Sequence, residues 1–389
     1  MTDLIDVLVV GTGPVGMLLA LALEEARVDY RLVGNEREAQ DRPIALAYNS
    51  RILLDRLGAF RALAATPIET IHVSQRGGFG RTLIRATDCH VPALGYVVSY
   101  ADLCSALRQR LPSPAVKAEV RRYAPSAQGD AIVVESSDAE PAQSFRARLL
   151  VLAEGGPLAD RAVSSLDRGR YSADGRRDYG QSAVVALVQT ELPHRNCAWE
   201  RFTADGPLAL LPCGERLSLI WSTTHESAHA LCALNDAAFL ARLGATFGGR
   251  LGRFVGSGPR SAFPVALRYR RGSPEPRVLA IGNAAQTLHP VAGQGLNLGL
   301  RDAWDLARSL EGAERNEIGS TQFIRRYCAA RSLDRGAGIR LTDALVRIFS
   351  NSNPAWMLAR GLGLAALDLT PPARQFFARR MMFGARALP

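Results

Sequence analysis

A glycine-rich turn between an apolar strand and an apolar helix, close to the start of the chain, constrains the fold more than any other feature. The apolar residues 7–10 are typical of a strand that is covered on both faces of a parallel sheet. Gly11, Gly13 and Gly16 follow in the spacing GxGxxG, and an apolar helix is predicted from there to about Ala26. Such glycines permit the turn, let a pyrophosphate approach the backbone, and let the helix pack on the strand. The segment therefore predicts a parallel α/β unit that binds a nucleotide.

The predicted second strand, in residues 30–38 ("YRLVGNERE"), departs from the usual pattern of such units. An acidic residue normally ends this strand and accepts hydrogen bonds from the ribose of the nucleotide. Gly34 stands at that position, and Glu36 follows two residues later. Glu36 is therefore the candidate for the ribose contact.

The order of the predicted elements indicates two domains that are interleaved in the sequence. After the nucleotide unit, residues 71–96 alternate and turn like a β-segment, and residues 181–264 are mostly β by the same signals. A last strand of the nucleotide domain is predicted just before Gly282, and the rest of the chain is largely helical. This pattern differs from that of a simple dehydrogenase.

Composition narrows the class of protein. The net charge is +10, but Lys117 is the only lysine among 47 basic residues and the arginines are spread along the chain. Binding of a nucleic acid is therefore not predicted. There is no apolar run of about 18 residues, which predicts no transmembrane helix. The N-terminus "MTDLIDVLVVGTG" lacks a basic region before its apolar run, and the six cysteines are scattered, which indicates a cytoplasmic protein with reduced thiols.

Two further patterns in the sequence concern binding. His225 and His229 are four residues apart, but no third ligand with metal spacing accompanies them, so no metal site is predicted. The C-terminal segment mixes apolar residues with arginines. It fits either helices packed back on the nucleotide domain or a helix that contacts an anionic membrane or a partner. Those arginines are Arg360, Arg374, Arg379 and Arg380.

The segment "AIGNAAQTLHPVAGQGLNLGLRDAWDLA", residues 280–307, predicts a short strand, a Gly/Pro-rich loop and a helix, with few reactive side chains. A loop of this kind suits a cofactor that supplies the chemistry itself. With "GTGPVG" at 11–16, "DRPIALAYNSRILL" at 41–54, "IHVSQRGGFG" at 71–80 and "ERFTADGPLALLP" at 200–212, the chain resembles the class A FAD-dependent aromatic hydroxylases. Within that group it resembles the ubiquinone-biosynthesis branch, most of all the 2-polyprenyl-6-methoxyphenol hydroxylases.

The resemblance implies an α/β fold in which a Rossmann-like FAD-binding domain is interleaved with a β-sheet substrate domain and followed by a helical C-terminus. The implied limits are 1–70, 97–180 and 265–330 for the FAD-binding domain, 71–96 and 181–264 for the substrate domain, and 331–389 for the helical region.

The resemblance also implies which residues bind FAD. Arg42 would approach the ribityl chain, and the loop from Gly293 to Asn297 would line the isoalloxazine with its backbone N–H groups. Asn283 stands where the wider family has Asp, as it often does in this branch. The full implied set is Gly11, Gly13, Pro14, Gly16, Glu36, Arg42, Glu154, Gly282, Asn283, Gly293, Gln294, Gly295, Leu296 and Asn297.

The implied activity is hydroxylation of the ring of a polyprenylated phenol, with NADH or NADPH as electron donor and O2 as oxidant. No catalytic base stands out, and Pro290 and His289 are the candidates nearest to the flavin. Phe202, Leu210 and Trp221 are candidate channel residues, with ordinary sheet core as the alternative. The implied partners are the phenol, other ubiquinone-biosynthesis proteins and, peripherally, the inner face of the membrane.

Two alternative functions stay open. One is another flavin enzyme on the same fold, such as a hydroxylase of a soluble aromatic or a reductase. The other is a flavin-binding but weakly active member that acts within a biosynthetic complex. The second alternative is motivated by three departures from the family pattern, at Gly34, at Glu154 in place of a GADG-like acid, and at Ser105 in place of a glutamine.

Overall fold

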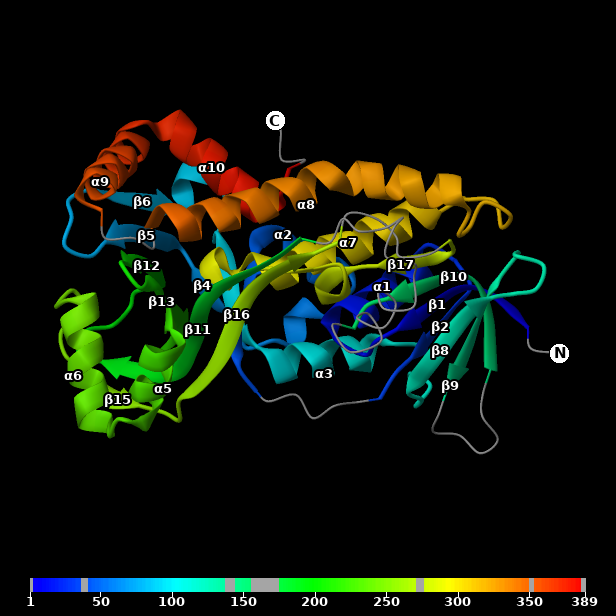
Figure 1. Cartoon of the computed structure of the whole chain (residues 1–389), viewed down its shortest axis with the longest axis horizontal. Coiled ribbons are helices and arrows are strands. Elements are labelled where there is room, and N and C mark those ends of the chain that lie inside the picture. Colours follow the sequence, from blue (N-terminus) through cyan, green and yellow to red (C-terminus); the bar gives the residue numbers. More distant parts are fainter. Residues whose placement is uncertain are drawn as a thin grey trace.

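The computed structural model of the chain describes residues 3–35, 41–136, 144–154, 175–270, 276–349 and 353–385. The described strands form sheets of six, nine and three strands, and the last part of the chain is helical (Figure 1). The mixed α/β fold with a helical C-terminal region, predicted from the sequence, is confirmed.

The six-stranded sheet contains the predicted nucleotide unit. Its strand order is β2-β1-β10-β9-β8, with β17 also paired to β10. The strands are β1 (Leu4–Val10), β2 (Tyr30–Val33), β8 (Val120–Pro125), β9 (Ile132–Ser136), β10 (Ser144–Leu152) and β17 (Val278–Ala280). β1, β2, β10 and β17 are parallel, and in register Val10 pairs with Leu152 and Leu152 with Ala280. The segments that follow β1, β10 and β17 therefore meet at one edge of the sheet, where ligands of such sheets bind.

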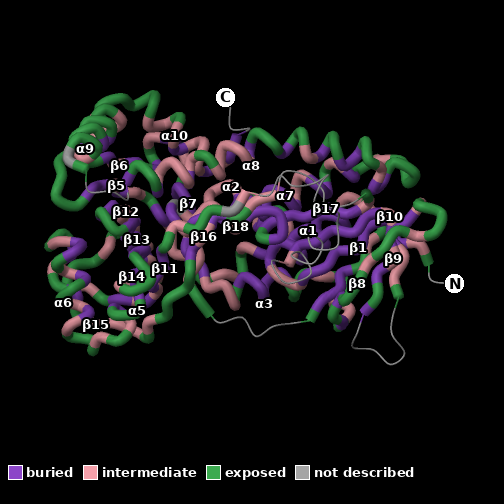
Figure 2. The backbone as a smooth tube through the Cα atoms, viewed as in Figure 1, coloured by how far each residue is buried: buried purple, intermediate pink, exposed green. Residues whose placement is uncertain are grey.

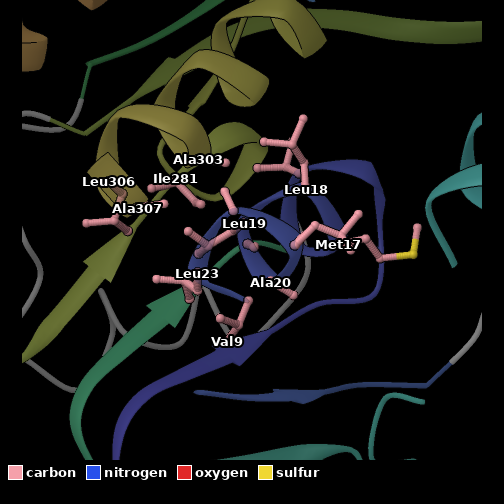
Figure 3. Packing of buried hydrophobic residues seen from close by; sticks show 14 of the residues in the cluster. Val9, Met17, Leu18, Leu19, Ala20, Leu23, Ile281, Ala303, Leu306 and Ala307 are labelled. Carbon is pink, nitrogen blue, oxygen red and sulfur yellow. The ribbon is translucent and has the colours of Figure 1, made fainter. Parts of the chain in front are cut away.

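Helix α1 (Pro14–Glu25) is buried from Pro14 to Leu23 and packs between the six-stranded sheet and two other helices, α3 (Tyr100–Arg110) and α7 (Gln294–Leu310). Figure 3 shows Leu19 and Leu23 of α1 between Val9 of β1 and small residues of α7 such as Ala303. Burial of one leucine side chain contributes about 1.5–3 kcal/mol. This packing fixes the glycine turn between β1 and α1, and Figure 2 shows the region as the most continuously buried part of the chain.

The nine-stranded sheet is the larger one, in the order β18-β16-β11-β14-β13-β12-β5-β6, with β15 also paired to β11. Its strands are β5 (Thr70–Gln75), β6 (Arg81–Arg85), β11 (Gly175–Thr190), β12 (Cys197–Thr203), β13 (Gly206–Cys213), β14 (Arg216–Thr224), β15 (Phe254–Ser257), β16 (Ser261–Tyr269) and β18 (Gln286–Thr287). Helices α5 (His225–Ala233) and α6 (Asp236–Phe247) pack against one of its faces (Figure 1). The other face is left for the site described below.

Short elements and the C-terminal helices complete the fold. The small sheet holds β3 (Pro43–Ala47), β7 (Gly95–Ser99) and β4 (Thr66–Ile68), next to helix α2 (Tyr48–Arg56). Four short 3-10 helices are η1 (Phe60–Ala62), η2 (Thr87–Cys89), η3 (Gly282–Ala284) and η4 (Val291–Gly293). The helices that end the fold are α8 (Thr321–Phe349), α9 (Pro354–Leu369) and α10 (Pro371–Phe383), and α8 runs along the long axis of the molecule (Figure 1).

Helix α9 is bonded to the hairpin formed by β5 and β6. The Thr82 hydroxyl donates to the Leu364 carbonyl at 2.6 Å, and the Leu83 amide donates to the Asp368 carboxylate at 2.8 Å. On α10, Arg374 pairs with Asp88 at 3.1 Å. The C-terminal helices thus pack back on the body of the protein through β5, β6 and η2.

The predicted domain limits fall inside elements of the structure. The limits near 181 and 264 lie in β11 and β16, beside a register shift between Asp178 and Gln181, where Gln181 pairs with Val265. The limit at 331 lies within α8. The division into domains itself stays a prediction.

All six cysteines are free thiols. Burial raises the pKa of each of them, and for Cys197 the pKa rises to about 11. Across the described part of the chain, no helix has the length and apolar character needed to span a bilayer.

Candidate functional site

A large cavity of about 1390 Å³ lies between the edge of the six-stranded sheet, the open face of the nine-stranded sheet and the C-terminal helices. Ligand pockets of proteins commonly measure about 300–1,000 Å³, so this cavity has room for a dinucleotide and a second ligand together. It begins at the glycine turn after β1, passes the loop between β17 and α7, and ends under α9. The segments that carried the family resemblance thus surround one space.

The three glycines of the turn have different surroundings. A Cβ on Gly16 would lie 1.9 Å from the Gly11 carbonyl oxygen, and one on Gly11, whose φ is +124°, would lie 2.8 Å from the Glu154 amide. Gly13 instead lines the cavity, and a Cβ there would meet only the Tyr100 hydroxyl, at 3.7 Å. Gly11 and Gly16 therefore permit close backbone packing, and Gly13 leaves the backbone open to a ligand, as a pyrophosphate requires.

The same end of the cavity has a polar wall. Pro14 begins α1, whose N-cap Gly13 offers no side chain to the first free N–H groups of the helix. Arg42 lies with its guanidinium 5.0 Å from the centre of the Tyr100 ring, and both line the cavity with Glu154. These residues suit an anionic nucleotide, because free N–H groups and a guanidinium bind phosphate.

The structure describes the surroundings of Gly34 and Ser105, two positions that depart from the family pattern. Gly34 has φ +154°, and a Cβ there would lie 3.2 Å from Thr12, so the turn itself favours glycine at this position. Ser105 lies on α3, where its hydroxyl accepts from Gln109 at 3.3 Å, and it does not line the cavity. The predicted ribose ligand Glu36 lies outside the described residues.

The loop between β17 and α7 is positioned mainly by one asparagine. Gly282, Asn283, Pro290 and Gly293–Asn297 all line the cavity. Asn297 is buried, and its Oδ1 accepts from the Ala47 amide and the Ser50 hydroxyl, both at 2.7 Å. Its Nδ2 donates to the Ala45 and Gly293 carbonyls at 2.9 and 2.7 Å. Asn297 therefore joins the loop to β3 with its polar side-chain groups fully used.

His289 is held in one tautomer by its neighbours. Its Nδ1 accepts from the Val291 amide at 3.1 Å, so the proton is on Nε2, which donates to the side-chain Oε1 of Gln181 at 3.3 Å. Burial lowers the pKa of His289 to about 4. The ring is neutral at neutral pH and fixes the loop against β11, although it also lines the cavity.

Behind the loop lies a network of charged side chains that are largely buried. Asp302 accepts hydrogen bonds from Arg331 at 2.9 Å, from Arg335 at 3.2 Å and from the Gln286 amide at 2.8 Å. Burial alone would raise the pKa of Asp302, but Arg335 and Arg331 lower it to about 2. Asp302 also accepts from the Gly282 amide at 3.4 Å, so the network supports the first residue of the loop.

Of the three predicted channel residues, one lies on the sheet face that lines the cavity and two do not. Phe202 of β12 lines the cavity and stacks on Phe349 of α8, with ring centres 3.8 Å apart. The prediction of Leu210 and Trp221 is wrong, because both side chains lie in the core on the opposite face, under α5 and α6. Since side chains alternate along a strand, their neighbours face the cavity instead. These neighbours are Ala209, Leu211 and Ile220.

Sequence reasoning missed Glu200, which lies on β12 and lines the cavity. Its Oε1 is buried and has no hydrogen-bond partner among the described residues. Burial raises the pKa of Glu200 to about 7. The alternation of Ala198, Glu200 and Phe202 was the available signal, because it places one acid on an otherwise apolar strand face.

No group of three or more His, Cys, Asp or Glu side chains in the described ranges is placed to hold a metal ion. His225 and His229 are exposed on α5, where His225 Nδ1 lies 2.8 Å from the Ser182 hydroxyl.

Comparisons with known proteins agree with this geometry. Residues 4–335 match a family described as an FAD binding domain. The ubiquinone hydroxylase UbiL of Rhodospirillum rubrum is 35% identical over 97% of this chain and 89% of its own length. The 3-demethoxyubiquinol 3-hydroxylase of Escherichia coli is 28% identical over 93% of this chain and 94% of its own.

Solved structures support the fold. The p-nitrophenol 4-monooxygenase PnpA of Pseudomonas putida has a TM-score of 0.75 at 18% identity, over 99% of this chain and 100% of its own. Klebsiella pneumoniae HpxO, solved with FAD and uric acid, has a TM-score of 0.73 at 16% identity, over 98% of this chain and 97% of its own.

Proposed function

The chain belongs to the class A FAD-dependent hydroxylases of ubiquinone biosynthesis, and from this premise we propose that it hydroxylates the aromatic ring of a polyprenylated phenol with NADH or NADPH and O2. One observation carries the proposal. A single cavity joins an open glycine turn, suited to a dinucleotide, to an apolar sheet face that is covered by apolar helices.

The residues present fit FAD at the glycine-turn end of the cavity. The open backbone at Gly13, the free N–H groups of α1 and Arg42 would hold the phosphates and the ribityl chain, while residues 293–297 would border the flavin ring. When bound, FAD would supply the redox chemistry that transfers electrons from the reduced nicotinamide to O2. The first turn of α7 adds a positive dipole end where the loop meets the cavity.

The other end of the cavity suits a ligand that is aromatic at one end and lipid-like at the other. Val73, Ile84 and Leu211 line it from the nine-stranded sheet, and Leu364 and Leu367 line it from α9. Such a wall excludes water from the reacting ring and places an isoprenoid chain against apolar side chains.

The proposed activity predicts a defined product. Purified protein loaded with FAD should convert 2-geranylphenol, in the presence of NADH or NADPH, into a product heavier by one oxygen atom, and that atom should come from labelled O2. Mass spectrometry measures the product, and the visible spectrum of the purified protein verifies that FAD is bound.

A small phenol separates the alternatives. If 4-hydroxybenzoate is hydroxylated and 2-geranylphenol is not, the protein is a hydroxylase of a soluble aromatic. If FAD binds and neither phenol is converted, the interpretation as a weakly active member of a biosynthetic complex replaces the proposal.

We also propose that the outer face of α9 contacts a membrane surface, the source of a lipid-like phenol. Leu358, Leu362 and Leu369 leave 55%, 56% and 82% of their surface exposed on the side of this helix that does not line the cavity. Phe79, on the turn between β5 and β6, is 51% exposed and lies beside Gly361 of α9. The helix also lines the end of the cavity, so a lipid would reach the cavity from this face.

Exposed arginines flank the proposed membrane face. Arg76, Arg81 and Arg85 lie on the hairpin of β5 and β6, next to α9. Each basic residue near an anionic membrane contributes about 1 kcal/mol of attraction. Apolar side chains with flanking arginines are the combination that peripheral membrane helices use.

The double variant Leu358→Glu, Leu362→Glu should lose most of its binding to anionic lipid vesicles in a sedimentation assay. Leu192→Glu, which changes a leucine that is 51% exposed in the turn after β11, is the matched control and should bind like the wild type. Equal binding by all three proteins would refute the membrane contact. Loss of association with another ubiquinone-biosynthesis protein instead of with vesicles would assign the face to a protein partner.

A further inference from the structure

The carboxyl group of Glu200 is the one acid on the sheet wall of the cavity among the described residues. Among those residues no hydrogen bond or ion pair involves this side chain, and its Oε1 is fully buried without a partner. Buried carboxyls are normally paired, because an unpaired charge in an apolar site is strongly unfavourable. The carboxyl group of Glu200 therefore makes no polar contact that would stabilise the fold among the described residues.

Glu200 lies on β12, between the apolar end of the cavity and the loop that connects β17 to α7. Directly opposite it on β13 stands Ala209, whose side chain is small and also lines the cavity. Two residues along the same face, Phe202 packs with Val291 of η4, directly after Pro290. The strand face that carries Glu200 therefore borders the loop where the flavin ring would lie.

No other charged group determines the state of Glu200. The cause of its raised pKa is burial alone. On the neighbouring strand β5, His72 lies against Trp199 and Arg250, and β13 carries no charged residue. The other titratable or charged residues that line the cavity are Arg42, Tyr100, Cys104, Arg108, Glu154, His289 and Arg360. Of these, His289 stands in the loop after β17, and both of its ring nitrogens are already used.

We propose that Glu200 is the general base that accepts the hydroxyl proton of the phenol. The O–H bond of the phenol breaks, its electron pair stays on the phenol oxygen, and the proton moves to the Glu200 carboxylate. The resulting phenolate is richer in electrons, which favours attack by its ring on an electrophilic oxygen. After the product leaves, Glu200 returns the proton to solvent through the cavity. This inference rests on the proposed function, since it requires a phenol as substrate.

The apolar surroundings suit this role. A catalytic base works best when its pKa lies near the working pH, and burial is the usual way to raise the pKa of a glutamate. A carboxylate without a hydrogen-bond donor around it has its lone pairs available for the substrate. If the N–H groups at the start of a helix or an arginine donated hydrogen bonds to this carboxylate, its lone pairs would not be available for the substrate.

Three variants test the proposal: Glu200→Gln, Glu200→Asp, and the control Glu215→Gln, which changes an exposed acid in the turn between β13 and β14. With 2-geranylphenol, Glu200→Gln should lower kcat by about 10²-fold or more near neutral pH, with little change in KM. The difference from the wild type should shrink at high pH, where the phenol ionises without a base. Glu200→Asp should recover part of the rate, and Glu215→Gln should equal the wild type.

A second readout does not depend on turnover. Infrared difference spectra of the FAD-loaded protein, recorded between about pH 5 and about pH 9, should show the loss of a protonated carboxyl band in the wild type. The band should be missing in Glu200→Gln and present in Glu215→Gln. The O-methyl ether of 2-geranylphenol, which has no proton to lose, should bind wild type and Glu200→Gln equally.

The outcomes separate this proposal from the proposed function. If the wild type hydroxylates 2-geranylphenol and Glu200→Gln does so at the same rate and with the same pH profile, Glu200 is not the base. If the wild type converts no phenol while the infrared band titrates as expected, the proposed function fails and the role of Glu200 as a phenol base falls with it. If the ether binds Glu200→Gln much more weakly than wild type, Glu200 shapes the cavity and does not act as the base.

Discussion

Alanine at Gly16 is expected to unfold the nucleotide end of the protein, whereas alanine at Gly13 should weaken FAD binding in a chain that still folds. A Cβ on Gly16 would lie 1.9 Å from the Gly11 carbonyl oxygen, so the backbone itself would have to move inside the main core. Forcing extra atoms into a packed core destabilises by about 1–3 kcal/mol, and backbone displacement places Gly16→Ala at or above the upper end. Thermal unfolding of the FAD-free variant measures this loss.

Gly13→Ala is the matched variant that separates binding from folding. Gly13 has φ −77° and ψ 174°, an extended conformation that alanine adopts without strain. Its Cβ would enter the cavity, where FAD phosphates are expected to approach the backbone. The Tm of the FAD-free protein should stay unchanged while the Kd for FAD rises more than about tenfold, or about 1.4 kcal/mol. Unchanged FAD affinity, measured by flavin fluorescence, would show that the dinucleotide does not pass Gly13.

The second large effect is expected at Asp302. Asp302→Asn would remove the carboxylate that Arg331 and Arg335 share. Arg331 would keep Asp305 and Asp334, but Arg335 would lose its one ion pair among the described residues. Removal of one partner from a buried ion pair destabilises a protein by about 3–5 kcal/mol. Denaturant unfolding should show a loss in this range. The control Glu135→Gln, which breaks an exposed pair with Arg122, should leave stability nearly unchanged. A small loss for Asp302→Asn would mean that Asp305 and Asp334 compensate for the lost carboxylate at Arg331.

The same residue predicts a dependence of stability on pH. Because its neighbours hold the pKa of Asp302 at about 2, below its usual value, the carboxylate stabilises the folded state fully above about pH 4. This contribution, about 2 kcal/mol, should be lost as the pH falls towards 2. The difference in free energy of unfolding between the wild type and Asp302→Asn should therefore shrink over that range. A difference that is constant with pH would contradict the low pKa.

The sequence predicted the parts of the fold that depend on local backbone geometry. The GxGxxG spacing after residues 7–10 and the Gly/Pro-rich loop after residue 280 each require a particular turn, and they fall where β1, β17 and α7 meet the cavity. The prediction of Leu210 and Trp221 as channel residues is wrong for a different reason. Alternation separates the two faces of a strand, but it does not say which face α5 and α6 cover.

Two functional features could not be found by local pattern. Asp302 lies on α7, whereas its partners Arg331 and Arg335 lie on the next long helix, α8. Only the packing of α8 on α7 brings these residues together. Glu200 was visible in the sequence as an acid on an apolar strand face, but its lack of any partner depends on the cavity. A buried unpaired acid is a property of the folded chain, so no spacing rule reveals it.

The raised pKa values of the six thiols have a consequence for the proposed reaction with O2. A flavin that reacts with O2 without a substrate in place releases hydrogen peroxide, and peroxide oxidises cysteine through its thiolate form. Because burial keeps the thiolate fraction of every cysteine low at neutral pH, each side chain reacts slowly with peroxide formed a short distance away. Cys104, which lines the cavity, is the most exposed to this hazard, and it too has a raised pKa. Under the proposed function, burial of the thiols would therefore limit their oxidation by peroxide formed in the cavity.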